Sequence, residues 1–199
     1  MARIAVVLFN LGGPDRTESI KPFLFNLFND SAIISLPQPI RWCLAKFISW
    51  RRARTAIKIY AQLGGKSPLL ELTEAQADAL QAELNDLGEV EIFVCMRYWH
   101  PMSAEIVKKV MRFAPDRIVL MPLYPQYSTT TTGSSLQEWK KASEKAKLIV
   151  STSAVCCYPT EDGWIKAQVQ LLENSLEKVS EDRNPRVLFS AHGLPKHII

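Results

Sequence analysis

The side chain best suited to chemistry is His192, which directly follows the apolar run Val187–Ala191 and precedes Gly193. The run has the β-branched and aromatic residues typical of a strand. In open α/β folds, ligands bind beyond the carboxyl ends of strands, so His192 stands where a site would open. An imidazole can accept a proton near pH 7 or bind a metal such as Fe²⁺. A structural histidine is an equal alternative from this residue alone.

Two further apolar runs end in polar and aromatic side chains. Arg97 and Tyr98 follow the run that ends at Met96, and Tyr127 follows the run that ends at Tyr124. Because the carboxyl ends of parallel strands meet at one edge of a sheet, these side chains are expected on the same side as His192. The hydroxyl run after Tyr127 is compatible with a phosphate site at a helix N-terminus, and a plain capping loop is the alternative.

A basic and aromatic segment lies between Arg41 and Tyr60. At helical spacing, Trp42, Lys46 and Trp50 share one face. Flat apolar surface beside guanidinium groups suits a flat aromatic carboxylate, because arginine binds carboxylates through two parallel hydrogen bonds. A solvated amphipathic helix and attachment to an anionic membrane surface are the alternatives.

Composition narrows the class of protein. The 199 residues are 47% apolar and 22% charged, with a formal net charge of +4, which is ordinary for a globular domain. No nucleic-acid-binding signature is present, and Asn10–Pro14 lacks the glycine spacing of nucleotide-binding loops. No apolar run reaches the roughly 20 residues of a membrane span. The cysteines have no metal-site spacing, which indicates a reducing, cytoplasmic-type compartment; they are Cys43, Cys95, Cys156 and Cys157.

Apolar runs alternate with helical patterns along the chain. The runs are Ile4–Asn10, Val90–Met96, Ile118–Tyr124, Leu148–Ala154 and Val187–Ala191. Such runs are typical of strands buried on both faces, so the sequence predicts an α/β fold with a doubly wound, mostly parallel sheet. A capping box at Thr73 and Gln76 predicts a helix that begins there and stops at Gly88. Residues 17–70 contain helical patterns without a strand, which predicts an inserted helical lip.

Six motifs occur in order along the chain: NLGGP (10–14), FLFNLFND (23–30), YAQLGGKSPL (60–69), MRYWHP (96–101), PLYPQYSTTTTGS (122–134) and FSAHGLP (189–195). Together they resemble the ferrochelatase family, whose members insert Fe²⁺ into protoporphyrin IX to form haem. The resemblance implies a Rossmann-like chelatase half over residues 1–160, with the helical lip at about 17–70. Residues 161–199 would then be a connecting helix and the first strand of an incomplete second half.

The resemblance also implies roles for individual residues. His192 corresponds to the active-site histidine, as proton acceptor, as metal ligand, or as both in turn. Residues that would contact the porphyrin or its propionates are Arg52, Tyr60 and Ser67, and those that would line the cleft are Arg97, Tyr98 and Tyr127. Arg52 is placed by spacing alone, next to Arg51 and Arg54.

Family members are much longer, and the glutamate expected opposite the histidine is not matched in these 199 residues. We therefore expect a family ferrochelatase with protoporphyrin IX and Fe²⁺ as substrates, no tightly bound cofactor and no nucleic-acid partner. The expected location is cytoplasmic, with peripheral contact to the inner membrane left open. The alternatives are a tetrapyrrole-binding fragment without activity, a related cobalt chelatase, or half of a split chelatase that needs a partner carrying the C-terminal half.

Overall fold

The structure, a computed structural model, describes residues 2–179 and 184–193. Its centre is a four-stranded sheet in the order β2-β1-β3-β4, with all neighbouring strands parallel. The strands are β1 (Arg3–Asn10), β2 (Glu89–Met96), β3 (Arg117–Pro122) and β4 (Ser151–Ala154). The predicted α/β fold with a parallel sheet is confirmed.

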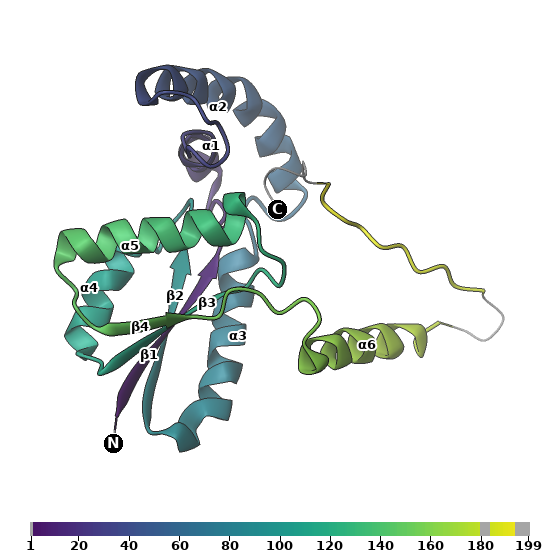
Figure 1. Cartoon of the computed structure of the whole chain (residues 1–199). Coiled ribbons are helices and arrows are strands. Elements are labelled where there is room, and N and C mark those ends of the chain that lie inside the picture. The colour runs from purple at the N-terminus through teal and green to yellow at the C-terminus, as the bar shows by residue number, and fades with distance from the viewer. Residues whose placement is uncertain (1, 180–183, 194–199) are drawn as a thin grey trace.

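Helices cover both faces of this sheet and its carboxyl edge (Figure 1). The helices are α1 (Ile20–Phe28), α2 (Gln38–Ala61), α3 (Leu69–Leu84), α4 (Ser103–Phe113), α5 (Ser134–Ala146) and α6 (Asp162–Leu176). Helix α3 lies on one face, α4 and α5 lie on the other, and α1 and α2 lie beyond the strand ends (Figure 1). The helical insertion predicted within residues 17–70 is therefore present as α1 and α2, which we call the lip.

Strand β1 is apolar throughout because helices cover both of its sides. Val7 and Phe9 belong to the core beneath α4 and α5, where the Phe9 ring meets Trp139 edge-on at 5.8 Å between centroids. Val6 and Leu8 point to the opposite face and pack with Ala77 of α3. The central strand thus ties the two layers of helices together and holds the loop that follows Asn10 in place.

The strand predicted at Val187–Ala191 is not formed, so that prediction is wrong. The described segment 184–193 has no regular secondary structure and pairs with none of the four strands. The side chains of Leu188 and Phe189 are each 89% exposed. Strand propensity reflects packing on a pleated, half-buried surface, and the described residues give this segment neither a neighbouring strand nor a covering helix.

The predicted start of a helix at Thr73 is also wrong. Helix α3 begins at Leu69, and Thr73 is buried in its first turns. The Thr73 hydroxyl donates to the Leu69 carbonyl at 2.7 Å and accepts from the Asn10 amide nitrogen at 3.1 Å. The hydroxyl therefore joins α3 to the end of β1 instead of capping a helix.

Helix α6 is exposed along its length, in contrast to α3, α4 and α5.

The strand predicted at Leu148–Ala154 is shorter than expected and begins at Ser151. No helix within residues 2–179 or 184–193 is both long and apolar enough to cross a membrane.

The burial of Leu8 and the exposure of Leu188 predict different losses of stability when each side chain is truncated. Leu8 is 1% exposed, so Leu8→Ala should lower the free energy of unfolding by about 3 kcal/mol through lost burial and a residual cavity. Leu188→Ala should change it by less than about 0.5 kcal/mol, because the side chain is already in water. Urea unfolding of the two variants checks this, and a large loss in Leu188→Ala would show that the segment is packed.

Candidate functional site

The strand order creates a crevice between β1 and β3. From β1 the chain moves outward to β2, and from β3 it moves outward in the opposite direction to β4. In open α/β sheets such a switch point, at the carboxyl ends of the strands, is the usual place for a ligand. A cavity of about 980 Å³ lies there, at the upper end of the range for small-molecule sites.

The cavity wall is formed by the end of α1 and the loop after it, by the loops after β1, β2 and β3, and by residues 190–193. The lining residues are Leu11, Leu27, Ile33, Tyr98, Tyr124, Gln126, Tyr127, Ser128, Thr130, Thr131, Ser190, Ala191, His192 and Gly193. Tyr98, Tyr127 and His192, which come from three distant parts of the sequence, are thus brought to one cavity. Arg52, Tyr60, Ser67 and Arg97 do not line it.

The cavity wall combines apolar surface with uncharged hydrogen-bonding groups. Burial raises the pKa of Tyr98, and the neighbouring Asp30 carboxylate raises it further. Burial likewise raises the pKa of Tyr124, although the Ser135 hydroxyl acts against it. Both phenols therefore stay protonated at neutral pH. Beside them, residues 129–133 form a π-helical turn whose first free amide groups are capped by Ser128, which accepts from the Thr131 amide at 3.1 Å.

A buried carboxylate, Asp30, fixes the residues behind this wall. One of its oxygens accepts from Arg97 Nη2 at 2.9 Å and from the Tyr98 hydroxyl at 2.8 Å, and also from the Ser134 hydroxyl. Its other oxygen accepts from the Ala32 amide at 2.8 Å. Arg97 Nε donates to Ser134 Oγ at 2.7 Å. Asp30 thereby joins the start of the loop after α1 to the loop after β2 and to the start of α5.

The electrostatics of Asp30 follow from these contacts. Burial alone would raise its pKa, but the hydrogen bonds from Ser134 and Ala32, the charge of Arg97 and the Tyr98 hydroxyl together lower it below the ordinary value. The Asp30 side chain is 4% exposed and that of Arg97 is 15% exposed. Arg97, predicted to line the cleft, instead pairs with Asp30 and places its guanidinium 4.8 Å from the centre of the Tyr98 ring.

Asp30 was not predicted as a site residue. It ends the motif FLFNLFND, which was noted only as part of the resemblance. An acidic residue at the end of an apolar helix gives no signal by itself. The sequence feature that could have indicated such a residue is Arg97 after β2, because a buried guanidinium requires an anionic partner.

Tyr60 and Ser67 lie on the lip side of the site. Tyr60 is half-buried against the cluster of Ile20, Phe23 and Tyr98, and this burial raises its pKa. The Ser67 amide donates to the Pro14 carbonyl at 2.8 Å, which fastens the start of α3 to the loop after β1.

Gly13 packs directly against Ser67 in this contact. A Cβ at Gly13 would overlap the side chain of Ser67, so only glycine allows the two loops to meet. The motif NLGGP therefore serves close packing between the loop after β1 and the start of α3.

Arg52 and the exposed aromatic residues occupy the outer side of α2. The Arg52 guanidinium lies 5.6 Å from the centre of the Phe28 ring, and the side chain is otherwise in solvent. Trp42, Phe47 and Trp50 are 45%, 56% and 58% exposed. The predicted face is partly covered by α1, because the Trp42 ring lies 6.2 Å from that of Phe25 and Lys46 Nζ lies 4.6 Å from the Phe25 ring centre, whereas Phe47 and Trp50 are free of α1.

Among the described residues, His192 is the candidate metal ligand at the cavity. His192 is exposed and faces the cavity, whereas His100 lies on the surface with its Nδ1 2.5 Å from a carboxylate oxygen of Glu105. Within residues 2–179 and 184–193, no three His, Cys, Asp or Glu side chains converge as a metal centre. The four cysteines are free, and burial raises the pKa of Cys95 to about 12. Leu194 and Pro195, which complete the motif around His192, lie outside the described residues.

Proteins of similar sequence belong to one family. The sequence model of the family described as Ferrochelatase matches residues 3–199. The chain is 49% identical over 195 residues to "Ferrochelatase" of Pelagibacter ubique, which covers 96% of this chain and 56% of that protein. It is 51% identical to "Ferrochelatase" of Phenylobacterium zucineum and 52% identical to that of Caulobacter vibrioides, with 99% of this chain and 57% of each relative covered.

These matches extend over nearly the whole chain, and their identity is far above what a shared fold alone requires. The chain belongs to the ferrochelatase family. It spans a little over half the length of these curated relatives.

The role of Asp30 can be tested through stability. At neutral pH, Asp30→Asn should lower the free energy of unfolding by about 3 kcal/mol, because it leaves Arg97 buried without a counter-charge. The folded-state pKa of Asp30 lies below its ordinary value of 3.8, so this contribution is present above about pH 4. It is lost as the pH falls through the lowered pKa.

Denaturant unfolding of the wild type and Asp30→Asn between pH 7 and pH 2 measures this effect. The difference in stability should shrink toward the acid end. Asp86→Asn, on an exposed carboxylate, is the matched control and should change stability at neutral pH by less than about 0.5 kcal/mol. A difference for Asp30→Asn that stays constant with pH would contradict the assignment.

Proposed function

We propose that this chain contributes the porphyrin-binding and histidine side of a ferrochelatase site, at which Fe²⁺ is inserted into protoporphyrin IX. The observation that carries the proposal is the cavity at the β1–β3 switch point, which His192 lines together with Tyr98 and Tyr127. Apolar and aromatic walls suit the flat macrocycle. Family membership supports the choice of reaction.

Metal insertion replaces two pyrrole protons by Fe²⁺. The planar ring hides its nitrogens, so the protein must bend the macrocycle, and the binding energy of the rest of the ring can drive this distortion. His192 lines the cavity, and no side chain in the described part of the protein forms a hydrogen bond with its imidazole. Imidazole is the most common general base in proteins, which suits His192 to accept a pyrrole proton. Fe²⁺ enters as a substrate, with His192 as its proposed protein ligand.

The remaining predicted residues take supporting roles in this proposal. Tyr98, held by Asp30, supplies a rigid wall, and Tyr127, which is 39% exposed, can adjust to the ring face. Arg52 and Tyr60 on α2 and Ser67 at the start of α3 would meet the porphyrin edge and its propionates. Because none of these three lines the cavity, this contact requires the ring to extend out of the cavity toward the lip.

Two histidines make a matched pair for testing the reaction. His192→Ala should reduce anaerobic Fe²⁺ insertion into protoporphyrin IX by at least about 100-fold, since it removes the proposed proton acceptor. His100→Ala should leave the rate unchanged, because His100 lies outside the cavity beside Glu105. The measurement is the absorbance change on haem formation, with the Caulobacter vibrioides relative as the positive control. Equal and measurable rates in the two variants would refute the role of His192.

A binding titration applies to the 199-residue chain whether or not it turns over. Protoporphyrin IX should bind with a visible absorbance shift, and Tyr127→Ala should weaken that binding. Tyr158→Ala, at a tyrosine outside the cavity lining, is the control and should leave it unaltered. If Tyr127→Ala does not change the affinity for protoporphyrin IX, the porphyrin site does not lie in this cavity.

We further propose a cytoplasmic protein whose lip touches the inner membrane. The exposed Phe47 and Trp50 rings lie 6.2 Å apart between centroids on α2, and Arg51 and Arg54 are exposed nearby. Interfacial aromatic rings next to cationic side chains favour anionic lipid surfaces.

Vesicle binding tests the proposed membrane contact. Phe47→Ser combined with Trp50→Ser should reduce co-sedimentation with vesicles containing anionic lipid by about tenfold, because two exposed rings are removed from the contact. Leu171→Ser with Val169→Ser, on the exposed helix α6, is the control. Unchanged sedimentation of the lip variant would contradict the proposed contact.

A further inference from the structure

Helix α6 carries an exposed apolar stripe on one side, which we call the α6 stripe. Its members recur at intervals of four, three and four positions, and they are Ile165, Val169, Leu172 and Leu176. At 3.6 residues per turn, these positions fall within about 60° of the helix circumference. Their side chains are between 37% and 46% exposed, and Figure 1 shows α6 standing apart from the sheet. No residue of α6 lines the cavity, so the stripe is independent of the proposed function.

A helix of this length depends on a partner for its stability. Helix α6 has 15 residues, and isolated helices of about that length are only marginally stable in water. Most helical stability in proteins comes from burial of an apolar face. At the start of α6 the Trp164 ring meets Tyr158 edge-on at 6.0 Å between centroids, but Trp164 lies outside the stripe. The stripe itself is therefore the surface that a partner would bury.

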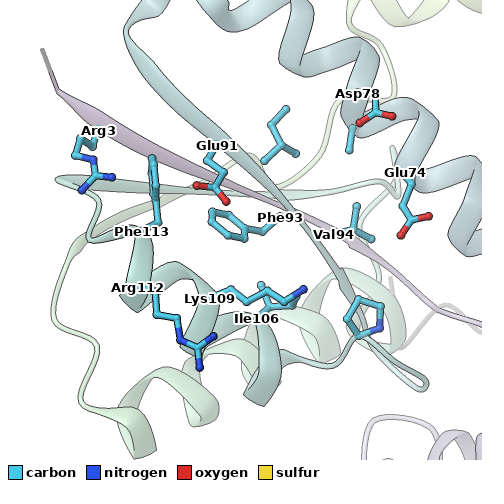
Figure 2. A pocket seen from close by; sticks show the side chains of 13 residues that line it. Arg3, Glu74, Asp78, Glu91, Phe93, Val94, Ile106, Lys109, Arg112 and Phe113 are labelled. Atoms are coloured by element: carbon cyan, nitrogen blue, oxygen red, sulfur yellow. The ribbon is translucent and has the colours of Figure 1, made fainter.

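The outer edge of the sheet at β2 offers no comparable surface. Gln81 Nε2 donates to the Val90 carbonyl at 2.9 Å, and the Met96 amide donates to the Pro101 carbonyl at 2.7 Å. Charged side chains of both signs border the groove beside this edge, with Glu91 on the strand itself (Figure 2). Charges and occupied backbone groups protect a sheet edge against association. The α6 stripe contains no charge and has no such protection.

The charges of α6 argue against a lipid surface as the partner. Helices that lie on membranes carry lysine and arginine on their polar face. Helix α6 has one basic residue, Lys166, against the two acidic residues Asp162 and Glu173. Anionic lipid repels a helix with net negative charge, so the stripe suits a protein partner.

We propose that the α6 stripe binds the same stripe of a second copy of this chain, with the two helices antiparallel. Intervals of four, three and four residues are those of the a and d positions of a heptad repeat. A two-fold axis between Val169 and Leu172 places Val169 of one copy beside Leu172 of the other. The same axis places Ile165 of one copy beside Leu176 of the other. One surface then serves both copies, as a two-fold interface requires.

Two charged residues beside the stripe favour the antiparallel orientation. Lys166 and Glu173 each follow a d position and are therefore both at e positions, where charges decide helix orientation. In the antiparallel pair, Lys166 of each copy lies beside Glu173 of the other, which gives two ion pairs. A parallel pair would place Lys166 beside Glu161 of the second copy, but the Glu161 carboxylate already accepts from the Trp164 amide at 3.0 Å. Among the residues that the structure describes, neither Lys166 nor Glu173 forms an ion pair.

Sedimentation equilibrium of the 199-residue chain tests the pairing. Two short helices bury less area than a standard interface, so we expect a mass that rises from 22.5 kDa toward twice that value as the protein concentration approaches about 100 μM. Val169→Asp should keep the chain monomeric over the same range, because it places a carboxylate in both central layers. Leu171→Asp is the matched control, since Leu171 is 62% exposed outside the stripe, and it should leave the dimer intact.

Two results of this experiment would overturn the proposal. A dimer that survives Val169→Asp would use another surface. A wild-type chain that stays monomeric would leave the stripe to a different protein or to a membrane. In that case, loss of co-sedimentation with anionic vesicles in Val169→Asp would identify the membrane as the partner.

Charge reversal tests the antiparallel orientation. Glu173→Lys should weaken dimerisation by about tenfold, because two ion pairs become two contacts between like charges. Adding Lys166→Glu to this variant restores both ion pairs and should restore the affinity of the wild type. Glu177→Lys makes the same change of net charge farther from the stripe and should have little effect. A double variant that dimerises no better than Glu173→Lys would refute the antiparallel pairing.

Discussion

The site depends on the burial of one carboxylate, Asp30, against one guanidinium, Arg97. Their contact at 2.9 Å, with Tyr98 and Ser134 on the same oxygen, holds three separate elements at one end of the sheet. A buried charge without its partner is strongly unfavourable, so the lip cannot leave the strand ends without exposing or stranding both groups. Because the Tyr98 hydroxyl donates to Asp30, this pair also fixes the position of Tyr98 in the cavity wall.

The parallel sheet supplies the other constraint. Because β1 is covered on both faces, its carboxyl end is fixed, and Gly13 in the loop after it allows the start of α3 to pack closely at Ser67. Loops from β1, β2 and β3 then meet beside residues 190–193. A rigid scaffold with an apolar, neutral cavity is what the proposed distortion of a porphyrin needs, since the strain must fall on the ligand and not on the protein.

Much of this could be predicted from the sequence. The apolar runs located β1 and β2 to within one residue, because these strands are covered by helices and leave a continuous apolar signal. The same signal failed at Val187–Ala191, because a pattern of side chains cannot show whether a neighbouring strand is available. The capping-box pattern at Thr73 also failed, because the Thr73 hydroxyl bonds Leu69 and Asn10. Tyr98 and Tyr127 follow β2 and β3 as expected and line the same cavity as His192, although His192 follows no strand. Asp30 required the fold, because the side chains that it bonds lie 67 to 104 residues away.

The most direct test of the account is whether a porphyrin meets His192. Nitrogen-15 NMR of the histidine side chains during titration with protoporphyrin IX reports on each imidazole separately, with assignments from single-histidine variants. The account predicts that the His192 resonances shift or broaden in proportion to bound porphyrin and that those of His100 stay in place. Porphyrin binding that leaves the His192 resonances unchanged would contradict it.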